Sequence, residues 1–210
     1  RGADIDHRGG QSTEWRERAL PAAERASVRP PQMLTDKLRR ALWRLVQGSL
    51  YRWSPAPCHG WRRFLLRTFG AVIEPGAHPY PTAVIWAPWN LTMGAVSAIG
   101  DGVEVYNVAH VSLGERCVIS QRSYLCTASH DFRSAGFELI AAPISVERYA
   151  WVAAGAFVAP GVTLGEGAGA GAMTALTRSA PAWTVVAGNP ARVLNTRAAD
   201  VGPRTYPGER

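Results

Sequence analysis

The sequence is poor in cysteine and lysine and has no long apolar run. Its three cysteines, Cys58, Cys117 and Cys126, are odd in number and lack the spacing of metal ligands, which argues against a disulfide framework and a cysteine-based zinc site. We therefore expect a reduced, cytoplasmic protein in which Cys117 is a packing residue. No apolar run reaches the roughly 18 residues that span a bilayer, and no signal peptide is visible at the start, so we expect neither a spanning helix nor secretion.

Lysine occurs once, at Lys37, so almost all of the positive charge comes from arginine. The formal net charge is +7 and the sequence pI is about 9.9. This charge favours anionic partners, and nucleic acid, acidic lipid headgroups and phosphate-bearing cofactors all meet that requirement. Nucleic acid is the weakest of the three, because the arginines alternate with apolar residues and no nucleic-acid recognition motif is present. We expect no nucleic-acid partner.

A period of six residues runs through the second half of the chain. Residues four places after the aliphatic positions are small or medium in size, so large and small side chains would alternate around a narrow axis. The pattern predicts an all-β solenoid, a parallel β-helix of hexapeptide repeats. The aliphatic positions, with a two-residue slip after the third and a longer interruption after the sixth, are Met93, Ile99, Val105, Leu113, Ile119, Leu125, Val146, Val152, Val158, Leu164, Ala170 and Leu176.

Two other structures compete for the same segment. An amphipathic α-helix would need apolar spacings of three and four, which the segment does not supply. A flexible Gly/Ala-rich stretch would fit the composition of residues 153–175, but the sustained phase of valine and leucine favours the coil. Glycines are then expected at the corners, where the backbone angles are costly for a residue with a Cβ. These are Gly100, Gly114, Gly155, Gly161, Gly165 and Gly167.

Composition divides the chain into four parts. Residues 1–32 are polar and basic and are predicted to be disordered. Residues 33–70 form an amphipathic helical segment, and residues 71–194 form the β-helix domain, from which residues 132–143 protrude as a loop. Residues 195–210 form a C-terminal tail.

The helical segment has two interpretations. One face would carry Leu38, Leu42, Leu45, Val46 and Leu50, while the arginines project elsewhere. The helices would then cover an open end of the β-helix or pack on a neighbouring subunit, because solenoid ends require a cap. Alternatively, residues 34–69 would make peripheral contact with an anionic membrane, since Trp and Leu opposite arginines are typical of an interfacial helix. We favour the cap.

The chemistry is expected where the repeat is interrupted. Residues 132–143 do not fit the phase and must leave the coil, and such a loop is the simplest way to form a pocket on a flat face. His130 stands where the loop departs, so its side chain should point outward. An imidazole can accept a proton from a hydroxyl that attacks a carbonyl, typically a rate gain of about two to four powers of ten. The competing interpretation is a surface histidine bonded only to Asp131. His110 could line the same cleft or bond to a backbone carbonyl.

Two segments carry a resemblance to a known family. They are residues 124–131, Tyr-Leu-Cys-Thr-Ala-Ser-His-Asp, and residues 183–193, Trp-Thr-Val-Val-Ala-Gly-Asn-Pro-Ala-Arg-Val. Together with the hexads, over residues 34–195, they resemble the hexapeptide-repeat acyltransferases. Within that family they are most similar to the colanic acid biosynthesis acetyltransferases, near the sugar O-acetyltransferases that modify galactosides and nodulation factors. The resemblance implies a left-handed parallel β-helix, a homotrimer with active sites between subunits, and acetyl-CoA as donor.

The resemblance also implies roles for individual residues. His130 matches the catalytic histidine that deprotonates the acceptor hydroxyl. Acceptor contacts are predicted from Asn107, just before the slip, and from Asp131. Asn195 stands where the family often has a further basic residue, for which Arg178 or Arg197 would compensate. The residues expected to bind acetyl-CoA are Ala154, Ala172 and Thr177 along the pantetheine arm and Arg192 at a phosphate or the adenine.

Two other classes of function remain open for a β-helix. Zinc-dependent proteins resembling γ-type carbonic anhydrases need three converging histidines, but only His110 and His130 lie within the coil. A non-catalytic trimeric scaffold would bind no CoA. We predict an acetyl-CoA-dependent O-acetyltransferase that needs no metal, acts on a saccharide hydroxyl in surface polysaccharide biosynthesis, and uses His130 as general base.

Overall fold

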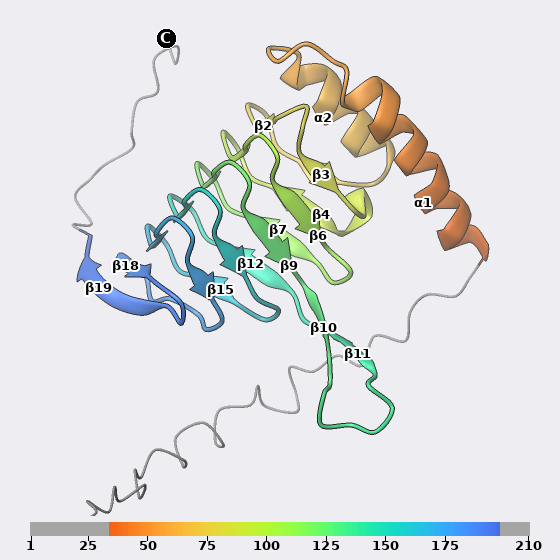
Figure 1. The fold of residues 1–210 in the computed structure, drawn as a ribbon. Coiled ribbons are helices and arrows are strands. Elements are labelled where there is room, and N and C mark those ends of the chain that lie inside the picture. Colours follow the sequence, from red (N-terminus) through yellow and green to blue (C-terminus); the bar gives the residue numbers. More distant parts are fainter. Residues whose placement is uncertain (1–33, 198–210) are drawn as a thin grey trace, which may run out of the picture.

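Short strands wind around one axis in the computed structural model, which describes residues 34–197 (Figure 1). The segment predicted to be disordered, residues 1–32, lies outside these residues, as does most of the predicted tail, 195–210. The strands form three parallel sheets, which we call the first, second and third faces. The first face contains β1 (Val72–Ile73), β4 (Leu91–Met93), β7 (Val111–Leu113), β12 (Ile144–Val146) and β15 (Thr163–Leu164).

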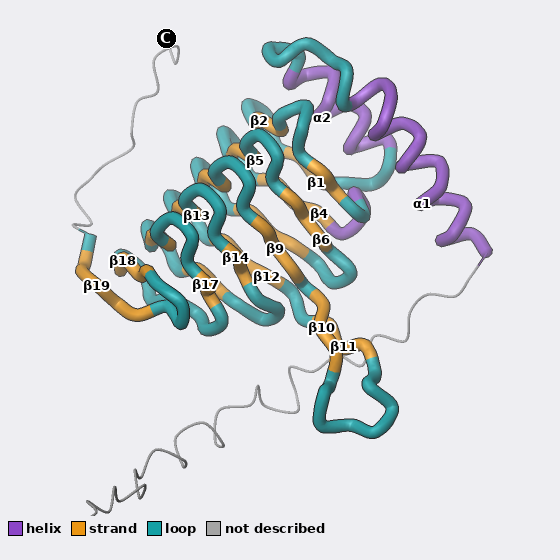
Figure 2. The backbone as a smooth tube through the Cα atoms, in the orientation of Figure 1, coloured by secondary structure: helices purple, strands orange, loops and turns teal. Residues whose placement is uncertain are grey.

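The other two faces continue each coil in sequence. The second face contains β2 (His78–Pro79), β5 (Ala98–Ile99), β8 (Val118–Ile119), β13 (Trp151–Val152), β16 (Gly169–Ala170) and β18 (Thr184–Ala187), with β19 (Arg192–Thr196) antiparallel to β18 at its edge. The third face contains β3 (Val84–Ile85), β6 (Glu104–Tyr106), β9 (Tyr124–Cys126), β14 (Phe157–Val158) and β17 (Ala175–Leu176). A hairpin of β10 (Ala128–His130) and β11 (Leu139–Ala141) projects from the coil after β9 (Figure 2).

The register between coils follows the six-residue frame. Met93 pairs with Leu113, Leu113 with Val146, and Val146 with Leu164, so a slip or the hairpin lengthens a coil without changing its phase. All twelve predicted inward residues are buried. The fold is therefore the predicted left-handed parallel β-helix with an N-terminal helical segment and a protruding loop.

The frame begins one coil earlier than the sequence pattern indicated. Ile73, Pro79 and Ile85 occupy the same inward positions in the first coil. The short 3₁₀-helix Pro88–Asn90 then lengthens the step from Ile85 to Met93, which hid this coil from the six-residue count.

Two of the small positions predicted four places after an aliphatic residue differ from the prediction, namely Ala109 after Val105 and Ser129 after Leu125. Ala109 is only partly buried and Ser129 is exposed, whereas Asn107 and Thr127 are buried. Both differences occur at the corner between the third and first faces, which we call the third corner. Here the chain turns inward two residues after Val105 or Leu125 and then leaves the hexad frame. Asn107 and Thr127, the inward polar residues at this corner, therefore hydrogen-bond to backbone groups that lie outside the regular strands.

Glycines serve the corners for two different reasons. Gly155, Gly161 and Gly167 have φ values of 69°, 77° and 64°, as the prediction required. Gly114 and Gly165 are not left-handed, but a Cβ on them would lie 2.4 Å from Arg148 N and 2.6 Å from Ala182 N, respectively. For these two residues the close approach of the next coil, not the backbone angle, explains the glycine.

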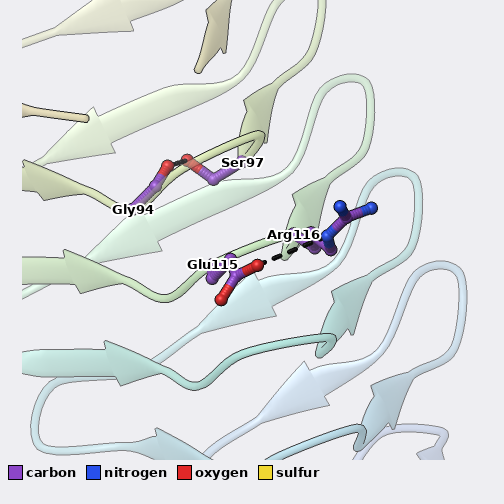
Figure 3. A network of polar contacts seen from close by, with 4 residues as sticks. All are labelled: Gly94, Ser97, Glu115 and Arg116. Carbon is purple, nitrogen blue, oxygen red and sulfur yellow. Dashed lines mark hydrogen bonds and ion pairs between the residues drawn. The ribbon is translucent and has the colours of Figure 1, made fainter. Parts of the chain in front are cut away.

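Polar groups at the corner between the first and second faces are paired locally. The hydroxyl of buried Ser97 donates to the Gly94 carbonyl at 2.7 Å, which removes the cost of burying it (Figure 3). One coil further, Arg116 Nε lies 3.3 Å from Glu115 Oε1 on the outside of the corner (Figure 3). Cys117 is buried beside this corner, and burial raises the pKa of its thiol to about 12. This fits the packing role predicted for Cys117.

The N-terminal segment folds into helices that cover one end of the solenoid (Figure 1). These are α1 (Leu34–Val46), a π-helical continuation η2 (Gln47–Tyr51), and α2 (His59–Thr68). Within residues 34–197, no helix is both long enough and apolar enough to cross a membrane. Trp43, Tyr51 and Leu66 face the coil and are fully buried.

The end that they cover has a specific need for hydrogen-bond donors. Each coil donates from its N–H groups to carbonyls of the next coil, as Glu74 N does to Met93 O at 2.8 Å. The first coil follows no other coil, so its equivalent carbonyls have no strand to donate to them. In the second coil the accepting carbonyls belong to Met93, Ser97, Ile99, Val103 and Val105, and their first-coil equivalents are Ile73, Ala77, Pro79, Ala83 and Ile85.

Side chains of the helical segment donate to all five of these carbonyls. The donors are Arg67 Nε to Ile73 O at 2.9 Å, Arg63 Nη1 to Ala77 O at 2.8 Å, Arg62 Nε to Pro79 O at 2.6 Å, Gln47 Nε2 to Ala83 O at 3.3 Å, and Trp43 Nε1 to Ile85 O at 2.6 Å. Buried carbonyls left unpaired would be costly, so these side chains replace the missing strand. The structure confirms that the segment caps the β-helix.

The face that performs this capping is not the predicted one. The leucines of α1, which amphipathicity suggested would pack inward, are exposed: Leu38 by 63%, Leu42 by 56% and Leu45 by 68%. The inward face instead presents Trp43 and hydrogen-bonding side chains. The physical reason is that the coil end is a layer of carbonyl groups, which bind N–H donors better than aliphatic side chains do.

Candidate active site

The third corner gathers most of the polar residues predicted to carry function. It joins the third face to the first in every coil, and the hairpin of β10 and β11 departs from it in the third coil. Asn107 and His110 follow β6 at this corner, His130 follows β9, and Thr177 follows β17 two coils further along. Since neighbouring strands are about 4.8 Å apart, the root of the hairpin and Thr177 are separated by about 10 Å along the axis.

His130 is the last residue of β10 and is exposed. Its Nδ1 lies 2.8 Å from the Phe137 carbonyl, and its ring stacks on the Phe137 ring with centroids 4.4 Å apart and an interplanar angle of 5°. A carbonyl can only accept, so Nδ1 carries the proton in the neutral ring and Nε2 keeps a free lone pair. The ring is thus held in the tautomer and orientation that a general base requires.

The Phe137 contact was not predicted from the sequence. Its polar half is a backbone carbonyl, which any residue at that position would provide. Only the pairing of β10 with β11, in which His130 lies opposite Leu139, brings this carbonyl to the imidazole. A six-residue period contains no information about such a hairpin.

Asp131 begins the tip of the hairpin, directly after β10. Its Oδ1 accepts from Arg133 N at 3.0 Å, and its own N–H donates to the Glu138 carbonyl at 2.9 Å. The Ser134 hydroxyl bonds to the Glu138 carboxylate, and this bond lowers the pKa of Glu138. These contacts give the tip a defined shape, and the predicted acceptor contact of Asp131 stays a prediction.

Asn107 is fully buried, and its amide bonds only to backbone among the contacts of the described residues. Oδ1 accepts from Ala87 N at 2.9 Å, while Nδ2 donates to Ala87 O at 2.7 Å and to Asn90 O at 3.0 Å. Asn90 in turn donates to the carbonyls of Asn107 and Val108. These bonds assign Asn107 a structural role at the third corner, and its acceptor contact remains a prediction.

His110 lies at the same corner one coil before the hairpin. Its Nε2 is 3.0 Å from Thr92 Oγ1, so it is bonded to the first face rather than to a backbone carbonyl. The zinc hypothesis needs three converging ligands. Among residues 34–197, no group of three or more His, Cys, Asp or Glu side chains is arranged to hold a metal ion.

A cavity of about 260 Å³ lies between the third corner of the last coil and the β18–β19 hairpin. Thr177 and Arg192, both predicted to bind acetyl-CoA, line this cavity together. Arg178 lines it too, whereas Arg197 donates to the Gly167 carbonyl at 3.0 Å. Of the two arginines suggested to compensate for Asn195, Arg178 therefore stands in the cavity. Two guanidinium groups in a cavity form a suitable site for phosphate.

Ala154 and Ala172 lie on a different edge of the prism. Both are exposed at the corner between the second and third faces, one coil apart, which we call the second corner. Met173 N donates to Ala154 O at 3.0 Å, which links the two coils there. Within one chain, the width of the third face separates these alanines from His130 and Thr177. The single chain therefore carries the predicted site residues as two separate sets.

Comparison with curated proteins identifies the family. The chain is 44% identical over 162 residues to "Putative colanic acid biosynthesis acetyltransferase WcaF" of Escherichia coli (strain K12), an alignment that covers 77% of this chain and 89% of that protein. The chain belongs to the hexapeptide-repeat acetyltransferase family. A second relative, nodulation protein L of Rhizobium meliloti (strain 1021), is 29% identical over 185 residues, or 86% of this chain and 98% of the relative. No family model matches the sequence.

Two solved structures of sugar acetyltransferases have the same fold. A galactoside acetyltransferase in complex with coenzyme A superposes with a TM-score of 0.71 at 18% identity, over 80% of this chain and 85% of that chain. A maltose O-acetyltransferase from Clostridium difficile 630 gives a TM-score of 0.69 at 19% identity, over 79% of this chain and 90% of that chain. At these identities the likeness shows the fold of this hexapeptide-repeat acetyltransferase and nothing finer.

Proposed function

We propose that this hexapeptide-repeat acetyltransferase transfers the acetyl group of acetyl-CoA to a saccharide hydroxyl, with His130 as general base. The observation that supports this proposal most strongly is the bond from Nδ1 of His130 to the Phe137 carbonyl, which leaves an exposed Nε2 free to accept a proton. The names of the relatives add the reaction class and the kinds of acceptor. Those names include colanic acid biosynthesis, maltose and galactoside.

His130 would act first as base and then as acid. Nε2 removes the proton of the acceptor hydroxyl while its oxygen attacks the thioester carbonyl of acetyl-CoA, which forms a tetrahedral intermediate. Collapse of the intermediate breaks the carbon–sulfur bond, and the imidazolium returns the proton to the departing CoA thiolate. The Phe137 carbonyl accepts a bond from Nδ1–H throughout and stabilises the imidazolium. The products are an O-acetyl saccharide and free CoA.

The cavity beside Thr177 is the proposed site for the donor. Arg178 and Arg192 would pair with phosphates of CoA, and Thr177 would lie along the pantetheine arm. This assignment extends the predicted set of Ala154, Ala172, Thr177 and Arg192 by one residue, Arg178. The basic charge of the chain favours binding of such an anionic donor.

We further propose a homotrimer whose active sites lie between subunits. A cyclic trimer buries two different surfaces of each subunit against each other, so one corner of one subunit meets another corner of the next. This would bring the second corner of one chain, with Ala154 and Ala172, beside the third corner of its neighbour, with His130. The proposed reaction belongs to surface polysaccharide biosynthesis at the cytoplasmic side, where acetyl-CoA is made.

A thiol-release assay tests the proposed reaction. Wild-type protein, acetyl-CoA and a panel of saccharides should release CoA and form an O-acetyl ester with at least one acceptor. His130→Ala should lower kcat by about 10²- to 10⁴-fold, because it removes the general base. His110→Ala is the matched control, since it removes another exposed imidazole of the same corner, and it should keep most of the activity.

Two results would contradict the proposal. Equal rates for the wild type and His130→Ala would show that the imidazole is not the base. Failure to bind CoA, together with indifference to His130→Ala, is what a non-catalytic scaffold predicts.

A further inference from the structure

The capping helices leave an exposed apolar surface on the side that faces away from the solenoid. We define the outer face as Leu38, Leu42, Leu45, Leu50, Trp53, Trp61 and Phe64, which are between 42% and 80% exposed. Leu38, Leu42 and Leu45 follow one stripe of α1 at spacings of four and three. The opposite side of α1, which carries Trp43, is the side that contacts the first coil and donates to its carbonyls. Capping therefore does not explain why the outward side of α1 is apolar.

Contacts between the helices make this surface continuous. Trp61 Nε1 donates to the Leu50 carbonyl at 3.0 Å, and the rings of Trp61 and Phe64 stack with centroids 5.7 Å apart. The apolar stripe of α1 therefore continues through Leu50 onto α2. A continuous apolar surface of this kind marks an interaction site.

The charges around the outer face identify the kind of partner. Residues 37–73 contain no acidic residue, and their eight cations are Lys37, Arg39, Arg40, Arg44, Arg52, Arg62, Arg63 and Arg67. Most of the arginines are engaged by the cap or by rings. The side chains of Lys37, Arg44 and Arg52 are exposed and make no hydrogen bond or ion pair with other groups of residues 34–197.

Arg44 and Arg52 flank a cavity at the rim of the outer face. This cavity, of about 230 Å³, is also lined by Gly48, Pro81 and Val84. Their neighbours Leu45 and Trp53 are 68% and 80% exposed, so cationic and apolar groups alternate along this rim. Two unpaired guanidinium groups beside leucine and tryptophan match the boundary between phosphate headgroups and acyl chains.

We propose that the outer face docks this protein onto an anionic lipid bilayer. Leu42, Leu45 and Trp53 enter the headgroup–acyl boundary, and Arg44 and Arg52 contact lipid phosphates. The helices then lie in the plane of the membrane, and the β-helix extends away from it. A protein partner is less well supported, because a surface with eight cations and no acid over 37 residues suits a uniformly anionic target.

Co-sedimentation with lipid vesicles tests this docking. The protein should bind vesicles of phosphatidylglycerol and phosphatidylcholine, and it should bind phosphatidylcholine alone at least about ten-fold more weakly. The double variant Leu42→Gln/Leu45→Gln should weaken binding by more than about ten-fold. Arg44→Gln/Arg52→Gln should weaken it by about five-fold per arginine, and added salt should have a similar effect.

The opposite end of the solenoid provides the matched control. Val193 and Leu194 of β19 are 59% and 67% exposed, close to the exposure of Leu42 and Leu45. Val193→Gln/Leu194→Gln should bind vesicles as the wild type does. The outer face lies outside the proposed acetyltransferase site, so Leu42→Gln/Leu45→Gln should transfer acetyl groups in solution at the wild-type rate in the thiol-release assay. A failure of the docking proposal can therefore be distinguished from a failure of the proposed function.

Three results would overturn the docking proposal. They are absence of wild-type binding to either vesicle, binding of Leu42→Gln/Leu45→Gln equal to the wild type, and binding that does not distinguish the two lipid compositions. Light scattering without lipid provides a further test. If the leucine variant forms a smaller assembly than the wild type, the outer face is an interface between copies of this chain.

Discussion

Asn107 holds the third corner together through three bonds from its side-chain amide to the backbone. Asn107→Ala would leave the N–H and carbonyl of Ala87 and the carbonyl of Asn90 without these partners in a buried place. We expect the free energy of unfolding to fall by about 2–4 kcal/mol, measured by urea denaturation. Asn195→Ala is the control: it removes an exposed amide and should change the free energy of unfolding by less than about 0.5 kcal/mol.

The same variant separates a structural role from acceptor binding. If Asn107 only holds the corner, the folded fraction of Asn107→Ala should keep the KM for the saccharide. A variant that unfolds like the wild type but has a raised KM would contradict the structural role and favour acceptor binding.

At the residue scale the sequence predicted a candidate base, His130, but not the orientation of its ring. His130 could be found because the phase of the hexads ends beside it. Its tautomer could not, since a carbonyl contributed by the hairpin sets it. For Asn107 the sequence predicted a role in acceptor binding but not its burial. The six-residue frame placed the inward side chain of this corner at Ala109, whereas the structure buries Asn107, which bonds to the backbone there.

The N-terminal cap depends on hydrogen-bond donors rather than on apolar packing alone. Arg62 is fully buried and donates to Ser54 Oγ and to the carbonyls of Pro55, Ala56 and Pro79. Arg62→Ala should lower the free energy of unfolding by about 3 kcal/mol or more, because the cap would lose four hydrogen bonds from one fully buried guanidinium and would be left with a cavity in its place. Urea denaturation measures the change. Arg52→Ala removes an exposed arginine of the same segment, and an equal loss in both variants would contradict the account of the cap.

Two histidines make the cap sensitive to acid. Burial lowers the pKa of His59 and of His78 below the usual value of about 6.5, and their rings lie 4.8 Å apart. The unfolded chain therefore binds protons at a higher pH than the folded chain does. Stability should be complete above about pH 6.5 and should decrease as the pH falls through the lower folded-state values.

Urea midpoints between about pH 7.5 and pH 5.5 measure this effect. The wild-type midpoint should fall over this range, and His59→Gln/His78→Gln should show a smaller fall. Identical pH dependence in the two proteins would show that these imidazoles do not contribute.

At the scale of elements, the periodic part of the chain was predictable and the helical part only in outline. A six-residue phase fixes which side chains of each short strand point inward, so the faces follow directly from the sequence. The helices of residues 34–68 were predicted as a cap, but their orientation depends on the carbonyl layer beneath them. Amphipathicity assumes an apolar target, and here it pointed the leucines of α1 the wrong way.

The whole molecule places its predicted site residues on two corners of a three-sided prism. His130 and the cavity of Thr177 and Arg192 lie along the third corner, while Ala154 and Ala172 lie along the second. Sequence alone could name these residues through the family resemblance. It could not show that one chain keeps the two sets apart, because that separation follows from the winding of the coil.

The central claim is that the third corner of one subunit and the second corner of its neighbour form one active site. Mixed trimers of His130→Ala and Ala154→Trp test it, the tryptophan being chosen to block the donor site. Each variant alone should be inactive in the thiol-release assay. Random trimers from equal amounts of both should recover about one quarter of the wild-type rate, since each mixed trimer contains one site with both intact corners. Mixed trimers that stay inactive, although each variant folds and assembles, would contradict a site shared between subunits.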